Sequence, residues 1–194
     1  MLEYVRDERR HAGFGEAPTK KVTECGIVRD FLAAAPDQFP VLSGSFIRVE
    51  PAHDPPDCIA EVPSGAQVAF EVTELVSRQA VAQNIAAGRD RTRSEDAVYW
   101  DPSREPIVAK LQEILDGKDA MVHGGGPYSE TVLVIHTDEF ALSFDELAPE
   151  LQNTGFKRTR RITRAFLFLS YDSCLKRKPY VELRLGLPLS TASP

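Results

Sequence analysis

The 194-residue sequence has few cysteines and no long hydrophobic run. Its three cysteines, Cys25, Cys58 and Cys174, are far apart and none lies in a C-x-x-C pair, so neither a disulfide framework nor a structural zinc site is expected. A reducing cytoplasm is the location that this cysteine usage favours. No stretch approaches the ~20 apolar residues of a membrane-spanning helix, and the charged first ten residues do not resemble a secretory signal peptide.

The chain also lacks an excess of positive charge. It has 23 Lys and Arg against 29 Asp and Glu, a formal net charge of -6. This balance argues against a protein that coats nucleic acid with its whole surface, but it leaves room for one local basic contact. A hydrophobic fraction of 42% is typical of a folded globular protein. We expect a flexible arm over residues 1–18 and a single domain over residues 19–194.

Hydrophobic patterns and turn residues predict a mixture of helices and strands. Helices are expected over residues 19–35, 74–87, 104–115 and 143–151. Strands are expected over residues 46–50, 57–62, 66–73, 131–136, 162–170 and 179–185. The third helix is expected to end near Gly117, and Ser143 to cap the fourth with a capping box. This order predicts an α/β fold with a mixed central sheet flanked by helices.

The apolar run over residues 131–136 is typical of a strand that is buried on both faces. His136 ends this run. We therefore expect it to be a histidine of the hydrophobic core rather than a metal ligand, since the four histidines share no metal-binding spacing.

Two acidic residues carry the strongest signal of chemistry. The turn Pro63-Ser64-Gly65 predicts that the second and third expected strands form a hairpin. If they pair about the middle of this turn, Asp57 falls opposite Glu71, and the two side chains share a face only when the loop is odd in length. A bulge at the glycine would supply the extra residue. Glu71 interrupts an apolar strand, where a carboxylate needs a partner or a metal.

The sequence around these carboxylates resembles the PD-(D/E)xK, restriction-endonuclease-like nuclease superfamily. Pro56-Asp57 is followed by Glu71-Val72-Thr73, and the order of expected elements is similar from residue 19 to residue 136. The resemblance implies a core of a helix, a hairpin-rich mixed sheet, a helix and a further strand. It also implies that Asp57 and Glu71 bind Mg²⁺ or Mn²⁺ with the Val72 carbonyl as a third ligand, and that metal-activated water hydrolyses a phosphodiester.

The sequence departs from this motif at Thr73, where the superfamily has a lysine that orients the water and offsets charge in the transition state. Some members carry the lysine on a following helix instead. Lys110 is the candidate for that lysine, with Lys118 as the second choice. The same resemblance places Glu24, on the first helix, toward the metal, and Gln79 is a further residue that could face the site.

A basic cluster is the expected contact with nucleic acid. Residues 157–164 hold five basic side chains and no acidic one, and each phosphate that they neutralise would make binding weaker as salt rises. The alternative is a solvated loop, or salt bridges to the acidic stretch 138–150. The five basic residues are Lys157, Arg158, Arg160, Arg161 and Arg164.

Three functions stay open on these observations. The first is a metal-dependent nuclease, a hydrolase acting on nucleic acid, with DNA as the first choice and no membrane partner. The second is a nuclease-fold protein that does not cut and binds nucleic acid or protein. Thr73 motivates it, and it gains if no lysine amine lies near Asp57 and Glu71. The third is an unrelated α/β protein in which both carboxylates are structural and point to opposite faces of the sheet.

Overall fold

The structure of the chain is a computed structural model that describes residues 20–39, 46–48, 56–61, 65–86, 100–101, 105–121, 128–139, 142–169 and 178–186. The arm expected over residues 1–18 lies outside these ranges. Four described helices are α2 (Lys20–Ala34), α3 (Arg78–Ala86), α4 (Ile107–Met121) and α5 (Phe144–Asn153). The strands are β1 (Phe46–Arg48), β2 (Cys58–Glu61), β3 (Gln67–Glu74), β4 (Tyr128–Thr137), β5 (Gly155–Phe156), β6 (Arg164–Leu169) and β7 (Tyr180–Leu185). No helix among the described residues is long and apolar enough to cross a membrane.

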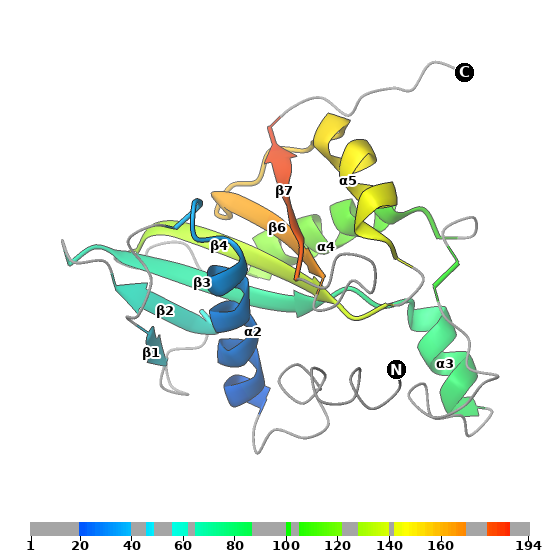
Figure 1. Cartoon of the computed structure of the whole chain (residues 1–194), viewed down its shortest axis with the longest axis horizontal. Helices are drawn as coiled ribbons and strands as arrows, with labels where there is room; N and C mark the ends of the chain where they lie inside the picture. The colour runs from blue at the N-terminus through cyan, green and yellow to red at the C-terminus, as the bar shows by residue number, and fades with distance from the viewer. Residues whose placement is uncertain are drawn as a thin grey trace.

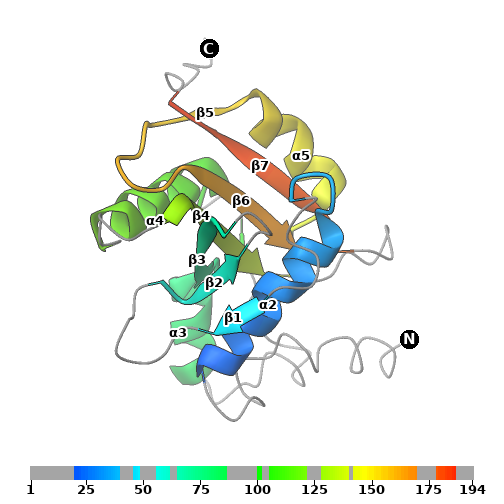
Figure 2. The same ribbon diagram turned by 90° about the vertical axis from the view of Figure 1, so that its left-hand side faces the viewer.

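Six of the described strands form a mixed sheet in the order β1-β2-β3-β4-β6-β7 (Figure 1). The short β5 pairs in parallel with the end of β7 (Figure 2). The first three strands are antiparallel neighbours. β4 runs parallel to both β3 and β6, and β7 returns antiparallel to β6. The chain is therefore an α/β protein with a mixed sheet and flanking helices, as its sequence predicts. Only β5 has no counterpart among the expected elements.

The sheet separates two hydrophobic cores, with α2 on one face and α4 on the other (Figure 2). Phe70 and Val72 of β3 pack in the core that contains Phe31 of α2. Leu111 of α4 packs in the other core, together with Leu133 of β4. Side chains alternate along a strand, so the odd-numbered residues of β3 face α4. Burial on both faces explains why β4 has an unbroken apolar run.

Helix α4 is longer than its sequence predicts. It continues through Gly117 to Met121, although glycine is a usual stop signal. A glycine within a helix costs only about 1 kcal/mol relative to alanine. Contacts of the following turn outweigh that cost, because Lys118 forms an ion pair with β3 and Asp119 accepts three backbone hydrogen bonds. This extra turn supplies the contacts on which the candidate site is built.

Two other helix starts differ from the expectation. Ser143 does occupy the N-cap of α5, but its side chain makes no capping hydrogen bond, so the expected capping box is absent. The helix expected from residue 74 begins at Arg78 instead, because β3 extends through Glu74. The backbone N–H of Ala80 donates to Ser77 Oγ at 3.2 Å, which caps that start.

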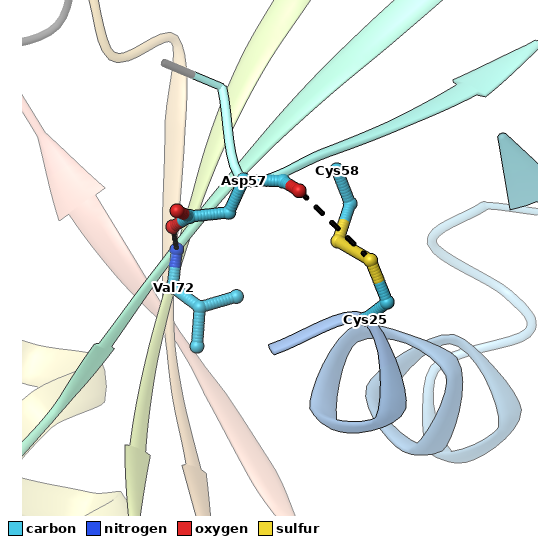
Figure 3. Close-up of a disulfide and its surroundings, with 4 residues drawn as sticks. All are labelled: Cys25, Asp57, Cys58 and Val72. Atoms are coloured by element: carbon cyan, nitrogen blue, oxygen red, sulfur yellow. Dashed lines mark hydrogen bonds between the residues drawn. A yellow bond between two sulfur atoms is a disulfide. The ribbon is translucent and has the colours of Figure 1, made fainter. Parts of the chain in front are cut away.

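A disulfide joins Cys25 of α2 to Cys58 of β2 (Figure 3). The expectation that all cysteines are reduced is therefore wrong for this pair. Their Cα atoms lie 5.9 Å apart, within the range that a disulfide needs. The two residues are 33 positions apart, and no local spacing in the sequence reveals that a helix and a strand bring them together. The disulfide links α2 to the sheet at Cys58, the residue that follows Asp57.

We predict that breaking this disulfide destabilises the protein. Cross-linking residues this far apart is worth about 3–4 kcal/mol through the entropy of the unfolded chain. Cys25→Ala should lower the free energy of unfolding by about that amount in urea denaturation, and dithiothreitol should lower the wild type to a similar value. Cys174→Ala serves as the control. Equal stability of the wild type with and without reductant would contradict the prediction.

Candidate functional site

The hairpin of β2 and β3 brings Asp57 and Glu71 to one face of the sheet. The strands pair from Glu61↔Gln67 to Cys58↔Phe70, which centres the hairpin on residue 64, the first of the two arrangements that the sequence leaves open. The connection, residues 62–66, is odd in length, and Gly65 within it has a φ of 82°. One more step of this register sets Asp57 opposite Glu71. Directly opposite residues of an antiparallel pair share a face.

Asp57 lies at the end of the hydrogen-bonded pairing between β2 and β3. It is buried, and its carboxylate Oδ2 accepts a hydrogen bond from the backbone N–H of Val72 at 2.8 Å (Figure 3). Figure 3 also shows its carboxylate and the sulfur of Cys58 on opposite sides of the strand. Asp57 thus points away from α2, and a side chain replaces the main-chain partner at the point where β2 begins.

Pro56 explains why the ladder stops here. A second step of the same register sets Pro56 opposite Val72. The N–H and C=O of one strand residue point to the same neighbour, so the Val72 carbonyl points to the side on which Asp57 takes its N–H. Proline has no N–H to donate to that carbonyl. A carbonyl and the two carboxylates therefore share this end of the hairpin.

Glu71 lies within the face of a central strand and is only 4% exposed. The ammonium of Lys118, in the last turn of α4, lies 3.2 Å from its Oε2. Electrostatic attraction is stronger in such a partly buried environment, where the effective dielectric constant is lower, than at the surface. A lysine amine is therefore present at the candidate site, delivered by a helix rather than by β3.

The structure corrects the choice between the two candidate lysines. Lys110 Nζ lies 3.0 Å from Glu113 Oε2 and 3.6 Å from Glu105 Oε1, so it pairs within its own region of the chain. Eight residues separate it from Lys118, about 12 Å along the helix. The sequence predicts that this helix ends near Gly117, whereas in the structure α4 continues and includes Lys118.

The three remaining predicted residues lie on three different elements, β3, α3 and α2. Thr73 follows Glu71 by two positions, so it shares its face and is half-buried. Gln79 is exposed on α3. Glu24 is buried, but α2 packs on the opposite face of the sheet. Among the described residues no three acidic side chains gather as a metal site, so Glu24 is not brought together with both Asp57 and Glu71, and its role as a ligand stays a prediction.

The chemistry of the donors fits a magnesium-like ion in part. Carboxylate and carbonyl oxygens are the ligands that hard divalent cations prefer. Among the described residues, no three side chains of His, Cys, Asp or Glu gather closely enough to hold a metal ion by themselves. An ion at Asp57 and Glu71 would depend on the Val72 carbonyl, on water and on substrate oxygens, which is a common arrangement for Mg²⁺.

The basic cluster lies beside the same turn of α4. Asp119 follows Lys118, and its carboxylate accepts backbone N–H bonds from Arg160, Arg161 and Ile162 at 2.8, 2.8 and 3.1 Å. Burial tends to raise the pKa of Asp119, but these three hydrogen bonds and the charge of Arg161 outweigh it and lower the pKa. Asp119 therefore stays ionised at neutral pH.

We call residues 157–162 the basic loop. Its first residue is also held by α4, because the Lys157 N–H donates to Gln112 Oε1 at 2.9 Å and its ammonium lies 3.5 Å from Asp116. Lys157 thus pairs with α4 rather than with the acidic stretch 138–150. The side chains of Lys157, Arg158, Arg160 and Arg161 are exposed.

Arg164 does not belong with these four residues. Its guanidinium lies 4.9 Å from the ring centres of Phe39 and Phe166, and it is 2.8 Å from a carboxylate oxygen of Glu182. It also bonds to the side chain of Gln38. Arg164 therefore packs at the α2 face as a structural residue, and its predicted contact with nucleic acid is not supported by this position.

Comparison of the chain with protein-family models, curated proteins and solved structures found no match. A proposal about function therefore rests on the arrangement of Asp57, Glu71 and Lys118, and on the basic loop beside them.

His136 lies at the end of β4, where it pairs in register with Glu74. It is 1% exposed and its ring lies 6.4 Å from that of Phe168, so it is a core histidine as expected. Burial lowers its pKa to about 4, against the opposing charges of Asp138 and Asp30 and with the help of Lys178. The ring is therefore neutral in the folded protein at neutral pH.

We predict that stability falls as the pH drops from about 6.5 toward 4. The unfolded chain binds a proton at His136 near its ordinary pKa of 6.5, whereas the folded chain resists it down to about 4. The free energy of unfolding should therefore fall by up to ~1.4 kcal/mol per pH unit in this window. His136→Gln should flatten the slope in urea denaturation, and His11→Gln should not. An unchanged slope in His136→Gln would assign the effect to other groups.

Proposed function

We propose that this protein is a metal-dependent nuclease that hydrolyses phosphodiester bonds of nucleic acid, with DNA as the first substrate to test. The observation that carries the proposal is the β2–β3 register, which sets Asp57 opposite Glu71, together with the ion pair of Lys118 and Glu71. The order of elements agrees with the resemblance in the sequence. A helix and three antiparallel strands are followed by helices and by β4, which runs parallel to β3.

Asp57 and Glu71, with the Val72 carbonyl, would hold Mg²⁺ or Mn²⁺. Such an ion supplies an activated water and stabilises negative charge on a phosphate. Asp57 has a second role, because its bond to the Val72 N–H fixes the strand end on which these oxygens depend. The Thr73 hydroxyl lies on the same face and offers a neutral donor where the motif has a lysine.

Lys118 takes the part of the missing lysine in this proposal. Without substrate its ammonium offsets the charge of buried Glu71, which would otherwise be costly to bury. When a phosphate is bound, the same ammonium is placed to offset charge that develops in the transition state. The exposed side chains of the basic loop would contact the phosphates of the chain beyond the site.

Metal binding tests the carboxylate pair. We expect Mn²⁺, titrated by calorimetry at low salt, to bind the wild type and to bind Asp57→Asn and Glu71→Gln at least about tenfold more weakly. Asparagine keeps an acceptor for the Val72 N–H, so the strand end stays intact. Glu150→Gln, at an exposed position of α5, controls for the loss of one negative charge. Equal affinity in all four proteins would remove the proposed site.

Cleavage of labelled duplex DNA, single-stranded DNA and RNA with Mn²⁺ tests the lysine. Lys118→Met should slow cleavage about a hundredfold or more, whereas Lys110→Met should change it by no more than a few fold. Lys118→Arg keeps the charge and separates loss of chemistry from loss of stability.

The opposite ranking of the two lysine variants would overturn the role given to Lys118. A wild type that binds Mn²⁺ and nucleic acid but cuts none of the three substrates would favour the second function, a binding module on the same fold.

A further inference from the structure

An acidic residue lies within the surface that is proposed to bind phosphates. Asp119 contacts the basic loop directly, and its carboxylate is ionised at neutral pH. A negative charge at this position opposes a polyanionic partner, because it adds repulsion where phosphates would bind. If net charge alone set the affinity, Asp119 would weaken the interface. The contacts of its carboxylate indicate a different role.

Three consecutive backbone N–H groups converge on this one carboxylate. Arg160 donates to Oδ2, and Arg161 and Ile162 donate to Oδ1. The hydroxyl of Thr159 donates to the Ile162 carbonyl and closes the same turn. The backbone of the basic loop is thus turned toward α4, while the side chains of Arg160 and Arg161 are exposed.

Both ends of the loop are also fixed. At the start, the Lys157 N–H donates to Gln112 Oε1 at 2.9 Å. At the end, Thr163 and Thr131 exchange backbone and hydroxyl hydrogen bonds of 2.8 to 3.0 Å. A loop held at its start, middle and end is ordered before a partner arrives, which removes much of the ordering cost from binding.

The anchor of the loop and the lysine of the site are neighbours in the chain. Lys118 reaches Glu71 and Asp119 reaches the loop from the same turn of α4. We propose that Asp119 is a positioning residue, which holds the basic loop so that a nucleic-acid backbone bound there runs to the Asp57 and Glu71 carboxylates. This inference rests on the proposed function and adds to it the element that aligns the substrate.

The test compares variants that change charge equally but differ in their hydrogen bonds. Asp119→Ala removes all three acceptor contacts, and Asp119→Asn keeps Oδ1 for Arg161 and Ile162. Asp145→Asn is the charge-matched control, since Asp145 is an exposed aspartate of α5 and not of α4. Each variant is measured for binding to a fluorescent duplex in EDTA over a range of salt, and for kcat and KM with Mn²⁺.

We expect Asp119→Ala to bind the duplex about tenfold more weakly in spite of its lost negative charge, because the loop must now be ordered on binding. The loss should appear mainly in KM. Asp119→Asn should lie between Asp119→Ala and the wild type, and Asp145→Asn should bind at least as tightly as the wild type. Hydrogen exchange should show faster exchange of the amides of residues 160–162 in Asp119→Ala, with the sheet amides unchanged.

Tighter or equal binding by Asp119→Ala would overturn the inference and leave the proposed nuclease in place. A wild type that binds no duplex at low salt would overturn the proposed function, and with it the inference. The exchange data separate these outcomes from misfolding, because a misfolded variant would also lose protection in the sheet.

Discussion

The buried charge of Glu71 is the constraint on which the arrangement of the site depends. A carboxylate within the face of a central strand must be matched by a cation, because isolated charges are costly to bury. Lys118 contributes to meeting this need by an ion pair, for which α4 runs past Gly117. The same extra turn of α4 places Asp119, which holds the basic loop.

The alternation of side chains at the start of β2 decides which face of the sheet each residue of the hairpin end points to. Asp57 faces the site and Cys58 faces the α2 core, because neighbouring strand residues point to opposite faces. Pro56 ends the pairing and Asp57 caps it. The dipeptide therefore has a structural role that would remain even without a metal. The proposed chemistry uses a strand end that the fold already has to stabilise.

Much of this fold could be predicted from the sequence because its signals are local. Alternating residues and the turn signal at Pro63-Ser64-Gly65 predict the hairpin, but they leave its register open, and the pairing of Asp57 with Glu71 follows only from the register in the structure. Choices that depend on distant contacts were missed. Gly117 is a local stop signal that tertiary contacts override. As a result, Lys118 rather than Lys110 is the lysine of α4 that pairs with Glu71. The face covered by α2, which brings Cys25 to Cys58, is likewise visible only in three dimensions.

Consecutive residues on an α-helix point about 100° apart, and α4 uses this angle between Lys118 and Asp119. One turn of helix presents one side chain to the sheet and the next to the basic loop. The angle between the two side chains around the helix axis is therefore fixed, and the two contacts depend on the same rotation of α4. A single residue inserted or deleted earlier in α4 would turn both side chains away from their partners together. The length of this helix is as much a part of the site as the identity of its residues.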